Sequence, residues 1–204
     1  VSVPVTVKHR LGVDDQDPET TLFDFVDTVA RSGVTSFAVH ARKAWLKGLS
    51  PKENRDIPPL DYDLVHRLKA ERPELEIILN GGLKSLDEVV ENSAGLDGVM
   101  VGRAAYQTPW ILSEVDSRLF GGPDPVSGPV KAVLTYRPYI ESQLADGVKL
   151  HAITRHMLGL FAGRPGARKW RQILSAEANR PDAGWAVVER ALDAVADPRE
   201  AVSA

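Results

Sequence analysis

The sequence predicts an α/β fold with a parallel sheet, followed by an all-helical region. Over the first 120 residues, short continuous apolar segments alternate with segments of helical periodicity. Beyond residue 130 the periodicity is helical only, and the Gly/Pro-rich stretch FGGPDPVSGP separates the two patterns. We therefore expect a first domain at 1–120, a linker at 121–129 and a helical domain at 130–204.

Four strands are predicted in the first domain, because each is short, apolar and bounded by turn or helix signals. They are VPVTV at 3–7, SFAVH at 36–40, EIIL at 76–79 and GVMV at 98–101. Helical spacing or an N-cap residue places helices between and after them, at 19–32, at 62–71 behind Asp61, behind Ser85, and at about 109–119.

Consecutive parallel strands require right-handed helical crossovers, which leaves two architectures open. One is a doubly wound open sheet, and the other is part of a (β/α)₈ barrel. A complete barrel takes about 250 residues, so four βα units in 120 residues would form half of one.

The second domain is expected to be all-α, with helices at about 130–145, 149–161, 167–176 and 183–194. Between residues 128 and 175 it carries eight Lys or Arg against two Asp or Glu, although the whole chain has a formal charge of −3. The helical part thus has a local basic segment, while the overall charge excludes a generic polyanion binder.

Composition excludes several other classes. Hydrophobic residues make up 43% and charged residues 26%, which is typical of a globular protein, and no apolar run is long enough to cross a membrane. The chain has no cysteine, which removes disulfides, thiolate zinc sites and cysteine nucleophiles. We expect no metal site.

Polar groups follow all four predicted strands, and the carboxyl ends of parallel strands meet at one edge of a sheet. These groups are Lys8, His40, Asn80-Gly81-Gly82 and Gly102-Arg103. The two glycine-containing turns are typical of loops that hold a phosphate. Taken singly, each has a plainer reading as a surface lysine, a core histidine or an ordinary turn glycine.

Exposed cations suggest a second function. Lys52 and Arg55 lie in the long loop 41–59, and Arg168 and Arg171 are spaced i, i+3 on a predicted helix. Together they could follow a polyanion across both domains, or they could simply be solvated surface.

Four strings, VTVKHRLG, FAVHARKAWLKGLSPKENRDIPPLDY, NGG and DGVMVGRAAY, closely resemble the tRNA-dihydrouridine synthases of the A-type subfamily. The resemblance extends over essentially the whole chain. It implies a flavin-binding (β/α)₈ barrel followed by a helical domain that grips the D-loop and elbow of tRNA in the cytoplasm. In that family NADPH reduces FMN, and FMN reduces the C5–C6 bond of D-loop uridines, at positions 20 and 20a for the A-type.

The resemblance also implies roles for individual residues. Lys8 would lie near the isoalloxazine ring, and His40 near the flavin or its phosphate. Asn80, Gly81 and Gly82, with Gly102 and Arg103, would form phosphate-binding loops. Lys52, Arg55, Arg168 and Arg171 would contact tRNA.

One departure from the family is the missing cysteine, which in the family is the catalytic acid and lies in the first half of the barrel. The Ala-Pro-Met flavin loop that precedes VTVKHR in the family is also missing. We therefore expect the last four βα units of a barrel plus the helical domain, with no catalytic residue and no activity alone. Open sheet edges would favour self-association. The alternatives are a non-catalytic tRNA-binding fragment or another FMN barrel that reduces small molecules.

Overall fold

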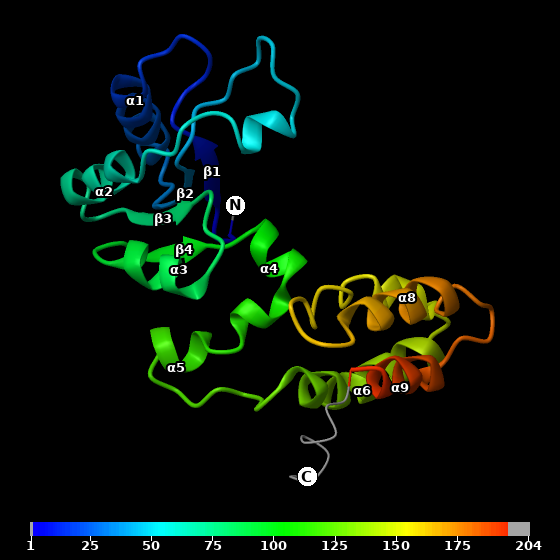
Figure 1. Cartoon of the computed structure of the whole chain (residues 1–204). Coiled ribbons are helices and arrows are strands. Elements are labelled where there is room, and N and C mark those ends of the chain that lie inside the picture. Colours follow the sequence, from blue (N-terminus) through cyan, green and yellow to red (C-terminus); the bar gives the residue numbers. More distant parts are fainter. Residues whose placement is uncertain (1, 196–204) are drawn as a thin grey trace. The chain divides into compact units, whose positions relative to one another are not determined.

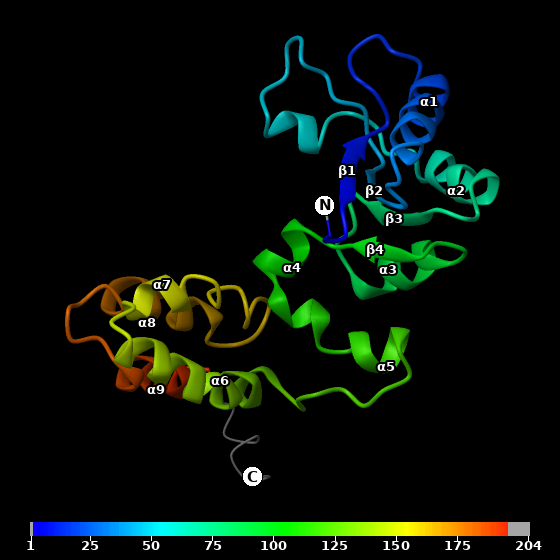
Figure 2. The ribbon, with the colours of Figure 1, turned by 180° about the vertical axis from the view of Figure 1, so that it is seen from behind.

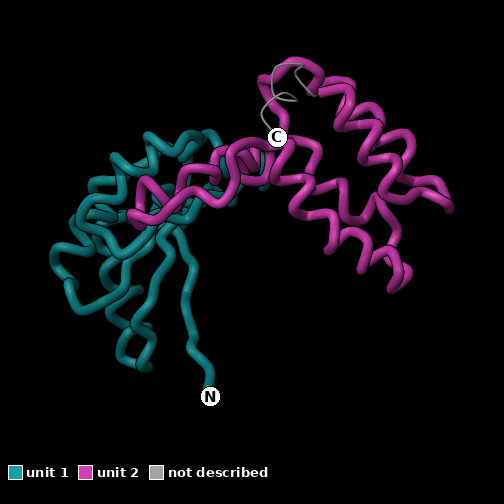
Figure 3. The backbone as a smooth tube through the Cα atoms, turned by 90° about the horizontal axis from the view of Figure 1, so that it is seen from below, with its two compact units in different colours: residues 1–102 teal, residues 103–204 magenta. Residues whose placement is uncertain are grey.

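The computed structural model describes residues 2–195 and divides the chain into two compact units, 1–102 and 103–204 (Figure 3). The predicted linker at 121–129 lies inside the second unit, and the division into domains at that linker stays a prediction. Each unit has its own hydrophobic core.

The first unit alternates strands and helices, as the sequence predicts (Figure 1). In chain order its elements are β1 (Thr6–Arg10), α1 (Pro18–Ala30), β2 (Ser36–His40), the 3₁₀ turn η1 (Glu53–Arg55), α2 (Tyr62–Glu71), β3 (Glu76–Asn80), α3 (Leu86–Ser93) and β4 (Gly98–Met100). The four strands form one all-parallel sheet in the order β1-β2-β3-β4, which confirms the predicted parallel sheet.

The core of this unit covers one face of the sheet. Helices α1 and α2 lie on the same side of the sheet in both views (Figures 1 and 2). Their buried side chains pack on strand residues of that face: Phe37, Val39, Ile77 and Leu79. Because side chains alternate along a strand, the opposite face carries Lys8 and Ala38 in one row and His40 and Asn80 in the next.

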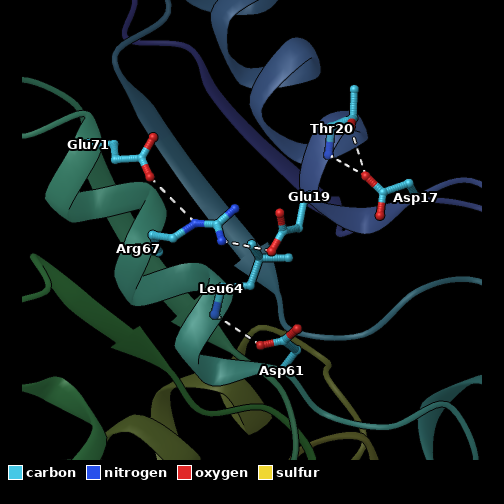
Figure 4. Close-up of polar contacts among 7 residues, drawn as sticks. All are labelled: Asp17, Glu19, Thr20, Asp61, Leu64, Arg67 and Glu71. Atoms are coloured by element: carbon cyan, nitrogen blue, oxygen red, sulfur yellow. Dashed lines mark hydrogen bonds and ion pairs between the residues drawn. The ribbon is translucent and has the colours of Figure 1, made fainter.

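Helix starts in this unit follow the sequence signals. Asp17, Asp61 and Ser85 accept hydrogen bonds from backbone N–H groups in the first turns of α1, α2 and α3. Arg67 of α2 donates to Glu19 of α1 at 2.7 Å and pairs with Glu71 at 3.5 Å (Figure 4). The two helices are thus tied at their exposed surfaces as well as through the core.

The first strand lies three residues later than predicted, at Thr6–Arg10 rather than 3–7. Pairing with β2 begins at Thr6 and Ser36, and the preceding Pro4 has no N–H to contribute to a ladder. Val3 and Val5, which suggested a buried strand, are 66% and 50% exposed. The apolar pattern therefore predicts the strand but places it three residues too early in the chain.

The second unit contains helices and no strand among its described residues. Its elements are α4 (Arg103–Gln107), η2 (Pro109–Leu112), α5 (Val115–Leu119), α6 (Pro129–Ala145), α7 (Leu150–Thr154), α8 (Ala167–Glu177) and α9 (Trp185–Asp193). Trp170, Phe161, Ile140 and Val188 are buried at the centre of its core. No helix in residues 2–195 is long and apolar enough to cross a membrane.

Two predicted helices of this unit are shorter than expected. The segment 109–119 breaks into η2 and α5, neither of which buries a side chain that could extend it. The segment 149–161 is helical only over α7 and continues in i→i+3 turns. At Gly159 a side chain would collide with the carbonyl of Gln107. These turns therefore pack closely against the backbone at Gln107.

Candidate functional site

Three of the predicted site residues meet at the carboxyl edge of the sheet. These are Lys8, His40 and Asn80. His40 and Asn80 are in register with each other and with Arg10 on neighbouring strands, and Lys8 lies two residues before Arg10 on the same face of the sheet. Lys8 Nζ donates to Asn80 Oδ1 at 2.7 Å, and Asn80 Nδ2 donates to the Met100 carbonyl at 2.7 Å. Both ends of the Asn80 amide are therefore used within the protein, and this amide holds the Lys8 ammonium in place.

The Gly81-Gly82 turn follows β3 directly and requires glycine at both positions. Its φ angles are +122° and +72°, in a region that residues with a side chain rarely adopt. A Cβ on Gly81 would lie 2.7 Å from Cδ2 of His40, and a Cβ on Gly82 would lie 2.5 Å from Leu60. The His40 ring thus packs directly against the turn, which joins two of the predicted site elements.

The Gly102-Arg103 turn is different. Gly102 does not adopt a positive φ, and a Cβ there would meet nothing within 4 Å. The structure therefore gives no local reason for glycine at this position. Arg103 begins α4 in the second unit.

The edge of the sheet is electropositive. Partial burial and the charge of Arg10 lower the pKa of Lys8, and burial with the charges of Arg42 and Arg55 lowers the pKa of Arg10. The polar partner of Lys8 is a neutral amide rather than a carboxylate, so its charge is not compensated there. Such a cluster is suited to an anionic ligand, which would relieve the repulsion between the cations.

The residues that order the long loop 41–59 were not predicted from the sequence. Arg10 donates from Nη1 to the carbonyls of Lys43 and Asn54, both at 2.8 Å, and the Arg42 guanidinium donates to the carbonyls of Asp56 and Pro58. Asn54 is buried and bonds the backbone of Trp45 through both ends of its amide. The available signal was an arginine at or just after each of the first two strand ends.

The predicted polyanion contacts are exposed on their respective units. Lys52 immediately precedes η1 and Arg55 is its last residue, and both are exposed at the surface of the loop. In the second unit, Arg168 and Arg171 share the exposed side of α8, whose other side buries Trp170. Their i, i+3 spacing on one helix is as predicted.

The model of the dihydrouridine synthase family matches residues 1–196 of the chain. The chain belongs to the dihydrouridine synthase family. This confirms the resemblance seen in the sequence motifs.

Several relatives of this chain match it at more than half of the aligned residues. It is 56% identical to a tRNA-dihydrouridine(20/20a) synthase of Salmonella typhimurium and 54% identical to one of Escherichia coli strain K12, each over 98% of the chain. A third, from Vibrio cholerae, is 52% identical over 94% of the chain. The chain spans 58–60% of the length of these relatives.

Proposed function

We propose that this chain is the part of a tRNA-dihydrouridine(20/20a) synthase that contributes a flavin-binding sheet edge and a tRNA-binding surface, acting in the cytoplasm. The observation that carries the proposal is the cationic, glycine-lined edge formed by Lys8, His40, Asn80, Gly81 and Gly82. It occurs in a chain 54–56% identical to enzymes of that name from Salmonella typhimurium and Escherichia coli.

We further propose that the four βα units form part of a (β/α)₈ barrel. Parallel sheets are normally covered on both faces, whereas the core of this unit covers only the face that holds Phe37 and Leu79. The other face carries Lys8, Ala38, Asn80 and Met100; Ala38 is buried, whereas Met100 is 36% exposed. A barrel interior is the environment in which such a face would be filled.

The edge fits flavin mononucleotide. The double-glycine turn, with two positive φ angles, is typical of loops that present backbone N–H groups to a phosphate, and the uncompensated Lys8 ammonium favours an electron-rich group beside it. When bound, FMN supplies the hydride, received from NADPH, that reduces the C5–C6 bond of a D-loop uracil. The other FMN contacts in this proposal are His40, Gly102 and Arg103.

The residues of this chain would bind and orient the flavin and the tRNA. Asn80 holds the Lys8 ammonium at the edge of the sheet. Burial and the charge of Arg10 lower the pKa of Lys8, which makes its ammonium a stronger hydrogen-bond donor to the flavin ring. Lys52 and Arg55 would bind tRNA phosphates from the first unit, and Arg168 and Arg171 from the second. The 204 residues contain no cysteine, so they offer no thiol to protonate the base.

The test measures FMN binding, tRNA binding and turnover separately on the purified chain. We expect quenching of flavin fluorescence on binding, and affinity for an unmodified tRNA transcript that falls steeply with salt. With NADPH present we expect no dihydrouridine by mass spectrometry. A matched pair, Arg171→Ala and Arg180→Ala, separates the predicted tRNA face from another exposed arginine: only the first should weaken binding and lower the salt slope by about one.

Absence of both flavin and tRNA binding by the folded chain would contradict the proposal. Flavin binding with no tRNA affinity would favour a reductase of small molecules. Affinity for tRNA without flavin would favour a non-catalytic tRNA-binding fragment.

A further inference from the structure

Tyr62, the first residue of α2, is not among the residues to which the family resemblance gives a role. Its hydroxyl donates to the carbonyl oxygen of Gly81 at 2.5 Å. The same oxygen accepts the backbone N–H of Leu83 at 2.9 Å. Two donors thus fix the direction of one carbonyl in the double-glycine turn, whose residues have no Cβ to restrict their backbone angles and adopt φ of +122° and +72°.

Tyr62 is itself held by a closed ring of hydrogen bonds. The Ala41 N–H donates to the Asn80 carbonyl, and the Asp61 N–H donates to the Ala41 carbonyl, each at 2.9 Å. Asp61 also caps α2 by accepting from the Leu64 N–H at 2.9 Å. These bonds tie the start of α2 to the ends of β2 and β3, so the Tyr62 hydroxyl reaches Gly81 from a rigid base.

The geometry of the peptide unit gives this contact a consequence. The Gly81 carbonyl and the Gly82 N–H belong to one planar unit, and residues 2–195 contain no cis peptide, so the two groups point in opposite directions. Fixing the carbonyl toward Tyr62 therefore aims the Gly82 N–H away from it. A side chain on Gly82 would also lie 3.0 Å from the Tyr62 hydroxyl, so this contact requires glycine.

We propose that Tyr62 is a positioning residue that aims the Gly82 N–H at an anionic group, which under the proposed function is the phosphate of flavin mononucleotide. The inference rests on that function and adds to it a residue that acts through the turn without touching the cofactor. Burial and the Glu88 carboxylate raise the pKa of Tyr62, so its hydroxyl keeps its proton and stays a donor at neutral pH.

The test compares two ligands that differ only in the phosphate. FMN and riboflavin are titrated against the wild-type chain and Tyr62→Phe, which removes one hydroxyl and keeps the ring. We expect Tyr62→Phe to weaken FMN binding about fivefold and to leave riboflavin binding unchanged, as for the loss of one hydrogen bond. Tyr139→Phe, an exposed tyrosine of α6, is the matched control and should change neither affinity.

The outcomes separate this inference from the proposed function. A wild-type chain that binds FMN no more tightly than riboflavin contradicts the phosphate site itself. A wild-type preference that Tyr62→Phe retains, or an equal loss for both ligands, overturns only the role of Tyr62. Should Tyr62→Phe fail to fold by circular dichroism, the amide signal of Gly82 in the wild type decides: it should shift with FMN and stay in place with riboflavin, and a signal that does not shift with FMN overturns the inference.

Discussion

At the scale of single residues, the double-glycine turn has the strictest requirements of the candidate site. Its two positions differ from Gly102, where φ is not positive and no atom crowds the Cβ position. The backbone conformation thus requires glycine at positions 81 and 82, whereas it would accept a larger residue at position 102. It also gives a clean experiment, because an alanine can be placed at each position.

We expect Gly81→Ala to destabilise the chain by about 1–3 kcal/mol, because the residue would keep a φ of +122° and crowd the His40 ring. Gly102→Ala is the control and should change the free energy of unfolding by less than about 0.5 kcal/mol. Urea denaturation followed by circular dichroism measures both. Equal effects would show that the turn is not held in the observed conformation.

His9 is a second residue whose environment can be tested. Its Nδ1 lies 2.9 Å from the Arg10 carbonyl, which can only accept, so Nδ1 carries the proton of the neutral ring. The ring packs against Phe25 and Phe37, and Nε2 is buried without a hydrogen-bond partner among the described residues. Burial lowers the pKa of His9 from its ordinary 6.5, opposed by the hydrogen bond to Arg10 and reinforced by Lys8.

The direction of the resulting pH dependence follows from linkage. Below pH 6.5 the unfolded chain binds a proton that folded His9 does not, so the stability due to neutral His9 is complete above that pH. It is lost as pH falls from 6.5 toward the lower folded pKa. Thermal unfolding from pH 8 to 5 should show this loss, and His9→Phe should reduce it while His66→Phe should not. A slope unchanged in His9→Phe would contradict the assignment.

At the scale of elements, loop 41–59 is ordered by buried polar contacts rather than by an apolar core. Asn54 accepts from the Trp45 N–H at 2.7 Å and donates to the Trp45 carbonyl at 2.6 Å. Arg10 then joins the end of β1 to the Asn54 carbonyl. The loop that carries Lys52 and Arg55 is thereby fixed to the strand that carries Lys8.

Asn54→Ala should loosen this loop, because it leaves backbone groups of Trp45 without their partners. We expect a loss of about 1–3 kcal/mol in stability and faster proteolytic cleavage within 41–59. Lys52→Ala, at an exposed neighbouring position, is the control and should leave both unchanged. Proteolysis that is equally slow in Asn54→Ala would show that other contacts order the loop.

The order of the elements in the first unit could be read from the sequence, because each strand and each capped helix has a local signal. SFAVH and EIIL coincide with strands, and Asp61 and Ser85 cap helices as expected. The contacts of Asn54, Arg42 and Tyr62 could not be read, because they join side chains to backbone groups 9 to 19 residues away, and no local pattern specifies such pairs. The turns after α7 were missed for the same reason, since tertiary packing overrides helical periodicity there.

At the scale of the whole molecule, the sheet of the first unit is covered by its core on one face and ends in two outer strands. β1 and β4 are the outer strands of the sheet, and Val3 and Val5 extend from β1 as exposed apolar side chains. Edge strands with apolar surface pair readily with other chains. Self-association of the isolated chain, expected from its sequence, is therefore still a prediction with a structural basis.

Introducing a charge beside β1 tests this prediction, because a charged residue on an edge opposes pairing. We expect the chain to form dimers at rising concentration in sedimentation equilibrium, and Val5→Lys to weaken their formation at least severalfold. Leu134→Lys, which replaces an exposed apolar residue of α6 in the second unit, should leave the equilibrium unchanged. A chain that stays monomeric over the whole concentration range, or a dimer weakened equally by both variants, would show that the β1 edge does not mediate association.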